Sequence, residues 1–145
     1  MLNSLVLLSE KCELKTSTVL NKNSKEYGKQ FLIDGSDETC WCSDSGIPQW
    51  VAIKWDKPVN VFKIEAKFQG GFCGNRDTTV EAWDDVAKSW KLIENWPLED
   101  IGSKQTLTLK EHHRVTRLRL LFNSSTDFFG RIIMYELSIW GENSD

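Results

Sequence analysis

Strict alternation of apolar and polar side chains is clearest over residues 62–69. The apolar or small members of this pattern are Phe62, Ile64, Ala66 and Phe68. Successive side chains of a β-strand point to opposite faces of a sheet, so the pattern predicts a strand that is buried on one face. Residues 49–55 and 105–109 alternate in the same way and predict two further strands.

A hairpin is predicted in the middle of the chain. Residues 78–83 and 89–93 are rich in β-branched and aromatic side chains, and they flank the polar residues 84–88. Two such runs joined by a short turn are typical of a β-hairpin. Residues 132–140 predict a closing strand, and the Thr- and Val-containing residues 14–20 predict one near the start.

Polar stretches at residues 56–58 and 110–113 predict strand ends or turns, and residues 22–28 also predict a turn. Residues 27–33 are expected to form one helical turn, and no stretch has the period of an amphipathic helix. About eight short strands separated by turns predict an all-β fold, an antiparallel sandwich or barrel. The residues expected in its core are Trp41, Ile53, Ile64, Phe68, Leu118, Leu120 and Leu137.

Length and composition favour one folded domain over residues 1–145. The chain has 145 residues, is 40% hydrophobic and contains seven Trp, which is enough to build a core. Its formal net charge of −3 argues against a general nucleic-acid surface. The apolar run of residues 5–8 is too short for an export signal or a membrane span, so we expect a protein that stays inside the cell.

The four cysteines are expected to be reduced. Their even number permits disulfides, but a chain without an export signal favours free thiols. Cys40 and Cys42 also lack the two-residue spacing that is usual in zinc sites.

Catalysis is not predicted. The two histidines, His112 and His113, are adjacent, and neighbours on a strand point to opposite faces. The chain contains no nucleophile elbow, phosphate-binding glycine loop or zinc-protease motif, so we expect no enzyme activity. Arg117 and Arg119 would share one face of a strand, where they would either hold phosphate or an acidic partner or line the solvated face of a sheet.

An acidic turn lies between Phe31 and Trp41. Asp34-Gly35 is a tight-turn pair, and the residues after it add two acidic side chains and a Thr hydroxyl. Carboxylate, carbonyl and hydroxyl oxygens are the ligands that calcium prefers. The stretch therefore predicts either a calcium-binding loop or a loop whose acids are solvated.

Four motifs in chain order resemble the discoidin family, also called coagulation factor 5/8 type C domains. Ile33-Asp34-Gly35 leading to Glu38-Thr39-x-Trp41 is similar to the family signature. Residues 49–53, 80–83 and 135–141 are similar to a second strand, the central hairpin and the last strand. The resemblance spans nearly the whole chain and implies a galactose-binding-like jelly-roll β-sandwich of about eight antiparallel strands.

The resemblance also implies a structural calcium ion that joins the acidic turn to the last strand. Calcium takes about six to eight oxygen ligands, so backbone carbonyls or water would complete the shell. The implied ligands are Asp34, Ser36, Asp37, Thr39 and Glu136.

Within the family, the chain resembles a small intracellular branch in residues 38–41, 68–72 and 126–131. That branch implies a monomeric protein-interaction module of the nucleus and cytoplasm, which binds a nuclear receptor and represses its DNA binding and transactivation. Direct binding to nucleic acid or membrane is not implied. Loops carry binding residues more often than strands do, so two loops supply the expected contact surface. Its residues are Gln69, Gly70, Gly71, Phe72, Asp127, Phe128, Phe129 and Arg131.

Other functions fit the same family. In one alternative, the loops at one end of the sandwich bind a carbohydrate or an anionic lipid, and Phe72, Phe128 and Phe129 are exposed apolar contacts. In the other, these three rings are buried and the neighbouring glycines only permit tight turns. A scaffold role like that of the intraflagellar-transport member is a third choice. Secreted discoidin domains usually join their two ends by a disulfide. Cys12 has no cysteine partner in the last strand, which weighs against cell-surface roles.

Overall fold

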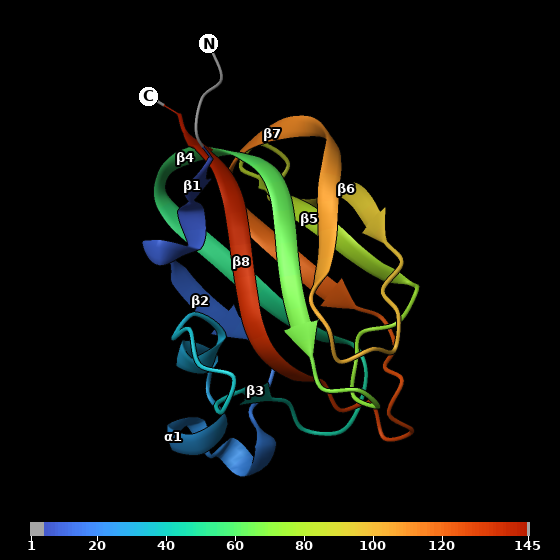
Figure 1. The fold of residues 1–145 in the computed structure, drawn as a ribbon. Coiled ribbons are helices and arrows are strands. Elements are labelled where there is room, and N and C mark those ends of the chain that lie inside the picture. Colours follow the sequence, from blue (N-terminus) through green and yellow to red (C-terminus); the bar gives the residue numbers. More distant parts are fainter. Residues whose placement is uncertain (1–4, 145) are drawn as a thin grey trace.

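The computed structural model describes residues 5–144, and its backbone is an antiparallel β-sandwich (Figure 1). One strand order, β1-β8-β4-β7-β5-β6, joins the layers, while β2 pairs with β4 and β3 pairs with β8. The predicted all-β jelly-roll class is confirmed. The strands are β1 (Val6–Leu7), β2 (Glu13–Thr16), β3 (Trp41–Cys42), β4 (Gln49–Phe68), β5 (Thr78–Asp84), β6 (Ser89–Trp96), β7 (Gln105–Phe122) and β8 (Ile133–Asn143).

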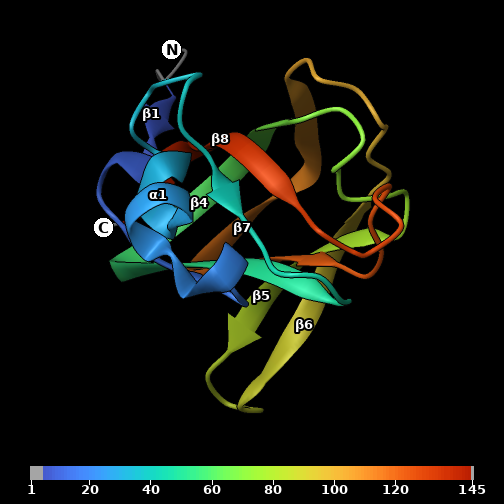
Figure 2. The same ribbon diagram turned by 90° about the horizontal axis from the view of Figure 1, so that it is seen from below.

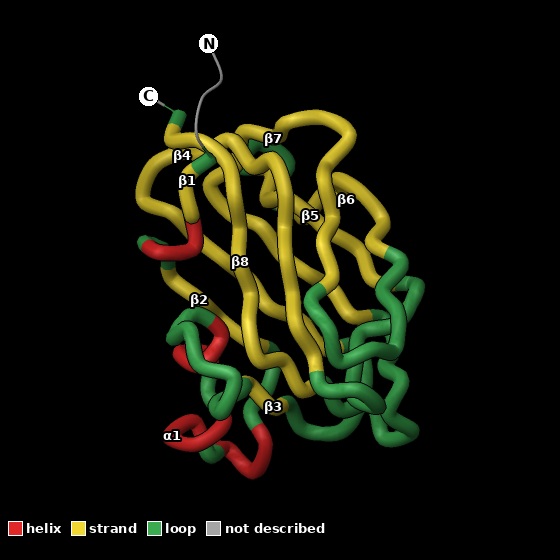
Figure 3. The backbone as a smooth tube through the Cα atoms, viewed as in Figure 1, coloured by secondary structure: helices red, strands yellow, loops and turns green. Residues whose placement is uncertain are grey.

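Helical structure is limited to short turns on one side of the sandwich (Figure 3). The predicted turn at residues 22–28 contains a four-residue helix, because the Asn23 side chain accepts a hydrogen bond from Glu26 N and caps it. Among the described residues, no helix is long and apolar enough to cross a bilayer. The helical segments are η1 (Leu8–Glu10), η2 (Leu20–Lys22), α1 (Ser24–Tyr27) and η3 (Lys29–Leu32).

Two long strands contribute to both layers of the sandwich. The first part of β4 pairs with β2 and with the end of β7, and its second part pairs with β8 and with the start of β7. Residues 56–58 and 110–113 therefore do not end strands, and that prediction was wrong. The polar residues 56–58 lie in a register shift between Lys54 and Val59, where an irregular ladder lets the strand bend without ending. Figure 2 looks along the sandwich and shows β8 in one layer and β5 and β6 in the other.

The core lies between the layers, and all seven residues that were predicted to be in it are buried. Phe62 is the exception within the alternating stretch: Val61 and Ile64 are buried, whereas Phe62 stacks on His112 with 3.6 Å between ring centroids. A register shift between Val61 and Lys63 changes the face to which Phe62 points. The predicted strand at residues 14–20 is shorter than expected, because β2 ends at Thr16.

Candidate functional site

The structure brings together the two loops that were predicted to bind a partner. Residues 69–72 follow β4, and residues 126–131 precede β8. Cys73 and Thr126 join the loops through two hydrogen bonds of 3.0 Å: Cys73 N donates to Thr126 Oγ1, and Thr126 N donates to Cys73 O. Ile133 N donates to Phe72 O at 3.0 Å. The loops therefore form one continuous surface at the end of the sandwich away from β1 (Figure 3).

A third loop, over residues 43–48, joins this surface. Its contribution to the surface was not predicted. Ser43 accepts a hydrogen bond from Ile132 N through its hydroxyl (2.8 Å), and Gly46 N donates to Phe129 O (2.7 Å). Gly130 has a φ of +83°, and a Cβ there would lie 2.8 Å from the Gly46 carbonyl, so the contact requires glycine. We call residues 46–47, 69–72 and 126–131 the loop surface.

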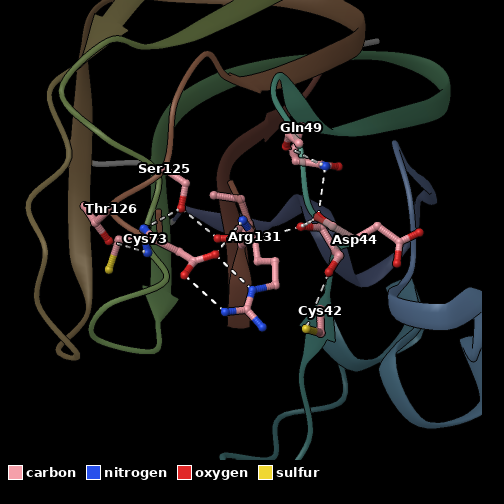
Figure 4. Close-up of polar contacts among 11 residues, drawn as sticks. Cys42, Asp44, Gln49, Cys73, Ser125, Thr126 and Arg131 are labelled. Carbon is pink, nitrogen blue, oxygen red and sulfur yellow. Dashed lines mark hydrogen bonds and ion pairs between the residues drawn. The ribbon is translucent and has the colours of Figure 1, made fainter. Parts of the chain in front are cut away.

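Gln49 holds the third loop in place through its contact with Asp44 (Figure 4). Its buried side-chain amide makes four hydrogen bonds. It accepts from the hydroxyls of Ser17 (2.5 Å) and Thr18 (2.8 Å), and it donates to the carbonyls of Asp44 (3.1 Å) and Gly46 (2.9 Å). The alternation of β4 places Gln49 in phase with buried Val51, which is the sequence signal that could have revealed a buried amide.

Arg131, labelled in Figure 4, forms an ion pair with Asp127 within the loop surface. Arg131 Nε donates to Asp127 Oδ2 at 2.9 Å, Arg131 Nη2 donates to Oδ1 at 3.2 Å, and Arg131 N also donates to Oδ2. These contacts hold the pKa of Asp127 below its usual range. The guanidinium lies 5.1 Å from the ring centre of Phe72 and 5.6 Å from that of Phe129. Arg131 thus organises the loop, and its charge is balanced by Asp127.

Asp100 holds the neighbouring turn by side-chain hydrogen bonds. Its role was not predicted from the sequence. Its Oδ1 accepts hydrogen bonds from Gly71 N (2.7 Å) and from Thr126 Oγ1 (3.1 Å). The Gly71 N–H is the main reason that the pKa of Asp100 lies below its usual range. Gln69 is held from the other side, because its Oε1 accepts a hydrogen bond from the Tyr135 hydroxyl at 2.9 Å. The loop surface is consequently cross-linked by polar contacts beneath it.

Three apolar side chains project from this cross-linked base. Phe128 is 94% exposed, Phe129 is 61% exposed and Ile47 is 58% exposed. The two Phe rings meet edge to face with centroids 5.2 Å apart, beside a shallow hollow of about 280 Å³ that Gly46, Ile47 and Ser125 also line. Phe72 is partly buried beneath Arg131. The loop surface can therefore offer apolar contacts with little unbalanced charge.

The acidic turn satisfies much of its own hydrogen-bonding capacity. Gly35 takes the positive φ of +73° that an Asp-Gly turn predicts. Asp34 accepts a hydrogen bond from Ser36 N (3.0 Å) through Oδ1 and another from the Thr39 hydroxyl through Oδ2. The Asp34 carboxylate therefore joins the two sides of the turn.

Two further predicted calcium ligands are paired with lysines. Asp37 lies 3.3 Å from Lys67 Nζ, and Glu136 lies 3.2 Å from Lys104 Nζ. Lys67 is also the cross-strand partner of Glu136, so positive charge separates the two carboxylates. Within residues 5–144, no three His, Cys, Asp or Glu side chains gather as a metal-binding group. The arrangement does not fit a ready calcium shell, and calcium binding stays a prediction.

The thiols offer no activated nucleophile. All four cysteines are free. Burial raises the pKa of Cys12, Cys42 and Cys73 to about 11, and it also raises the pKa of Cys40. These thiols are therefore protonated at neutral pH, which disfavours thiolate chemistry.

Sequence comparison matches this architecture to a family. The family model described as "NedA-like, galactose-binding domain", of the F5/8 type C group, matches residues 31–120. The chain belongs to the F5/8 type C family. The predicted family is therefore confirmed.

Curated relatives match this F5/8 type C chain over most of its length. A zebrafish (Danio rerio) protein is 38% identical over 136 residues, which cover 94% of this chain and 95% of the relative. A human (Homo sapiens) protein is 38% identical and covers 88% and 90%, and a Xenopus tropicalis protein is 42% identical and covers 88% and 91%. All three are named "Nuclear receptor 2C2-associated protein". These names and the family description are those of binding proteins.

Solved structures share the F5/8 type C fold at low sequence identity. An F5/8 type C domain from Bacteroides fragilis has a TM-score of 0.77 at 16% identity and covers 97% of both chains. A family 32 carbohydrate-binding module of Clostridium perfringens NanJ, in complex with galactose, has a TM-score of 0.77 at 14% identity and covers 94% of this chain and 99% of the module. Likeness at this identity establishes the fold alone.

Proposed function

We propose that this F5/8 type C domain is a protein-interaction module that associates with a nuclear receptor through the loop surface. The exposure of Phe128, at 94%, is the observation that carries the proposal. Large apolar side chains that gather on an otherwise polar surface commonly mark protein contacts. The names of the relatives at 38–42% identity support a nuclear receptor as the partner.

The base of the loop surface supports tight binding as well as contact. Thr126, Asp100 and Arg131 already hold the loops by hydrogen bonds in the free protein. Loops that are ordered before binding lose less conformational entropy when a partner docks. Aromatic anchors at the centre of an interface commonly supply most of its binding energy, so Phe128 and Phe129 are the expected anchors.

The proposal also includes repression of the receptor's DNA binding. A DNA-binding domain has a basic surface, and a domain with a net charge of −3 has no general electrostatic attraction to DNA phosphates. A module that covers part of the receptor would lower the receptor's DNA binding without competing for the DNA itself. This activity would place the protein in the nucleus as well as the cytoplasm.

Affinity capture of nuclear receptor 2C2 tests the contact. The double variant Phe128→Ser, Phe129→Ser removes the exposed rings, and Val86→Ser is the matched control because Val86 is 95% exposed on a hairpin turn away from the loop surface. We expect the double variant to capture the receptor at least about tenfold less well than wild type, at an unchanged Tm, because it loses anchor residues. The control should capture normally. Equal capture by all three proteins would reject the contact surface.

A gel-shift experiment tests repression separately. Increasing amounts of wild-type protein should remove the receptor–DNA complex, whereas the double variant should not. A slower ternary band would mean that the module binds the receptor without displacing DNA. Retention on galactose-bearing glycans or anionic vesicles, lost in the same double variant, would instead assign the loop surface to a sugar or lipid.

A further inference from the structure

A groove on the outer face of the β2-β4-β7-β5-β6 layer is separate from the loop surface. The strands of this layer lie behind β8 in Figure 1. Its volume is about 260 Å³. Ala52 is at its floor because Ala52 is the cross-strand partner of Lys15 on β2 and of Arg119 on β7, and both neighbours are long. Trp50 and Trp90 line it as well, so the hollow has apolar walls.

Guanidinium groups occupy the aromatic faces beside this groove. Arg119 Cζ lies 4.6 Å from the ring centre of Trp90, and Arg117 Cζ lies 5.5 Å from that of Trp83. The two Trp rings meet edge to face at 5.4 Å. A sugar ring or a nucleobase binds such a site by stacking on a free aromatic face, and here the arginines would have to be displaced first.

Among the described residues, only one of the cations at the rim of the groove forms an ion pair within the protein. Arg119 is neutralised by Glu81, with Nη2 and Nε at 2.6 and 2.8 Å from the same carboxylate oxygen. Within the described chain, Lys15, Lys54 and Arg117 form no ion pair, and Glu13 is the lone carboxylate that lines the groove. Lys54 is the cross-strand partner of both Arg117 and Glu13, so two of these cations are adjacent and the carboxylate lies beside one of them. A basic rim therefore surrounds an apolar hollow on a chain whose net charge is −3.

We infer that this groove binds an acidic segment of a partner protein. An aliphatic or aromatic side chain of the segment enters the hollow over Ala52, and flanking carboxylates pair with Arg117, Lys54 and Lys15. Opposite charge favours approach and fixes the orientation of the segment, while burial of the apolar side chain supplies affinity. The small number of free cations and the covered Trp faces disfavour a nucleic-acid strand. This inference does not depend on the nuclear-receptor proposal, since it uses another face of the sandwich.

Fluorescence anisotropy with a labelled peptide of alternating Glu and Leu tests the groove. We expect this peptide to bind wild-type protein, and more weakly at high salt because the ion pairs are exposed. Matched peptides of Gln with Leu and of Lys with Leu should bind at least about tenfold more weakly. No binding of the Glu peptide, or equal binding of all three peptides, overturns the inference. Tighter binding of labelled oligothymidylate would overturn it in favour of nucleic acid.

Three variants locate the contact. Arg117→Glu should weaken binding of the Glu–Leu peptide by about tenfold or more, since it reverses a rim charge. Ala52→Leu should also weaken it, because it fills the hollow at constant charge. Arg114→Glu makes the same charge change on the same strand, at an exposed position outside the groove, and should leave binding unchanged. An equal loss in Arg114→Glu would mean non-specific attraction and would reject the site.

The loop-surface double variant separates the two proposals. Phe128→Ser, Phe129→Ser should bind the Glu–Leu peptide like wild type. If that variant loses the peptide while Arg117→Glu keeps it, the peptide binds the loop surface and the groove assignment is wrong. Thermal melts of each variant, monitored by circular dichroism, show that a loss of binding is not a loss of folding.

Discussion

The loop surface and the groove both combine charged and aromatic side chains, but in opposite arrangements. At the loop surface the charged groups, Asp127 and Arg131, are paired beneath exposed Phe128 and Phe129. At the groove the aromatic rings lie under guanidinium groups, and Arg117 remains free to pair with another molecule. A cation held against an aromatic ring can thus stabilise an apolar surface in one place and a basic surface in another.

The difference depends on where the compensating carboxylate lies. Asp127 is four residues from Arg131 in the same loop and accepts its backbone N–H as well, so the charge is fully used inside the loop. Glu81 compensates Arg119 across the strand pair, but no described carboxylate pairs with Arg117. Local pairing therefore yields an apolar contact surface, and incomplete pairing along a strand yields a charged one.

Removal of a core ring should destabilise the whole sandwich and give the largest effect. Phe122 is fully buried at the end of β7 and packs against Phe68 and Trp41, with centroids 5.8 and 6.5 Å away. Phe122→Ala should lower the free energy of unfolding by about 3–5 kcal/mol, through lost burial and a cavity. Urea denaturation followed by Trp fluorescence measures this. A loss below about 1 kcal/mol would show that Phe122 is not a main support of the core.

A change at Gln49 should affect the loop surface more than the groove. Gln49→Leu leaves two hydroxyls and two carbonyls without their partner, and we expect a cost of about 2–3 kcal/mol. Hydrogen exchange should accelerate in residues 43–48 before it does in β5. Gln105→Leu is the matched control, since that less buried amide bonds only the Glu99 backbone, and it should cost well under half as much. Equal costs would contradict the role assigned to burial.

Acid should loosen the loop surface selectively. The folded pKa of Asp127 is below the ordinary value of 3.8, so its ionised form stabilises the fold above pH 3.8 and that stability is lost as pH falls through the folded pKa. Asp127→Asn should therefore cost about 1 kcal/mol at pH 7 and less at pH 3. Urea denaturation at both pH values measures the difference. A cost that is independent of pH would show that the charge of Asp127 is not what holds the loop.

Calcium should give the smallest effect. A ligand at a hundredfold excess over its dissociation constant stabilises a fold by about 2.7 kcal/mol, and calcium at this turn must first displace Lys67 and Lys104. When calcium replaces chelator, we expect the wild-type Tm to rise by an amount that corresponds to less than about 2.7 kcal/mol of stabilisation. The Tm of Glu136→Gln should not rise. An unchanged wild-type Tm, or an equal rise in the variant, would reject the predicted site.

Alternation along the chain was sufficient to predict the sandwich and its core, because a half-buried strand must place every second side chain inside. It did not predict that β4 and β7 continue through polar residues. Asp56 and His112 are unfavourable neighbours for a buried strand, but they lie where each strand passes from one layer to the other and can remain exposed. Phe62 was misplaced because bulges are determined by pairing with distant strands.

The loop surface was less predictable than the fold. Residues 69–72 and 126–131 were identified by family resemblance, and periodicity says nothing about loops. The contact between Gly46 and Gly130 depends on the final topology, as does the bond from Gly71 to Asp100. The alternate spacing of Arg117 and Arg119 indicated that both lie on one face of a strand. The hollow of the groove could not be predicted, because it depends on Ala52 lying opposite Arg119 in the neighbouring strand.

The passage of β4 and β7 through both layers determines how this protein could be divided. A chain cut within either strand would separate pairings that belong to both layers, so we expect neither fragment to fold independently. A cut in the exposed turn at residues 85–88 severs only the link between β5 and β6, whose ladder can re-form from separate pieces. That turn is therefore the expected split point for a fragment-complementation reporter, and β4 and β7 should each be kept intact within one fragment.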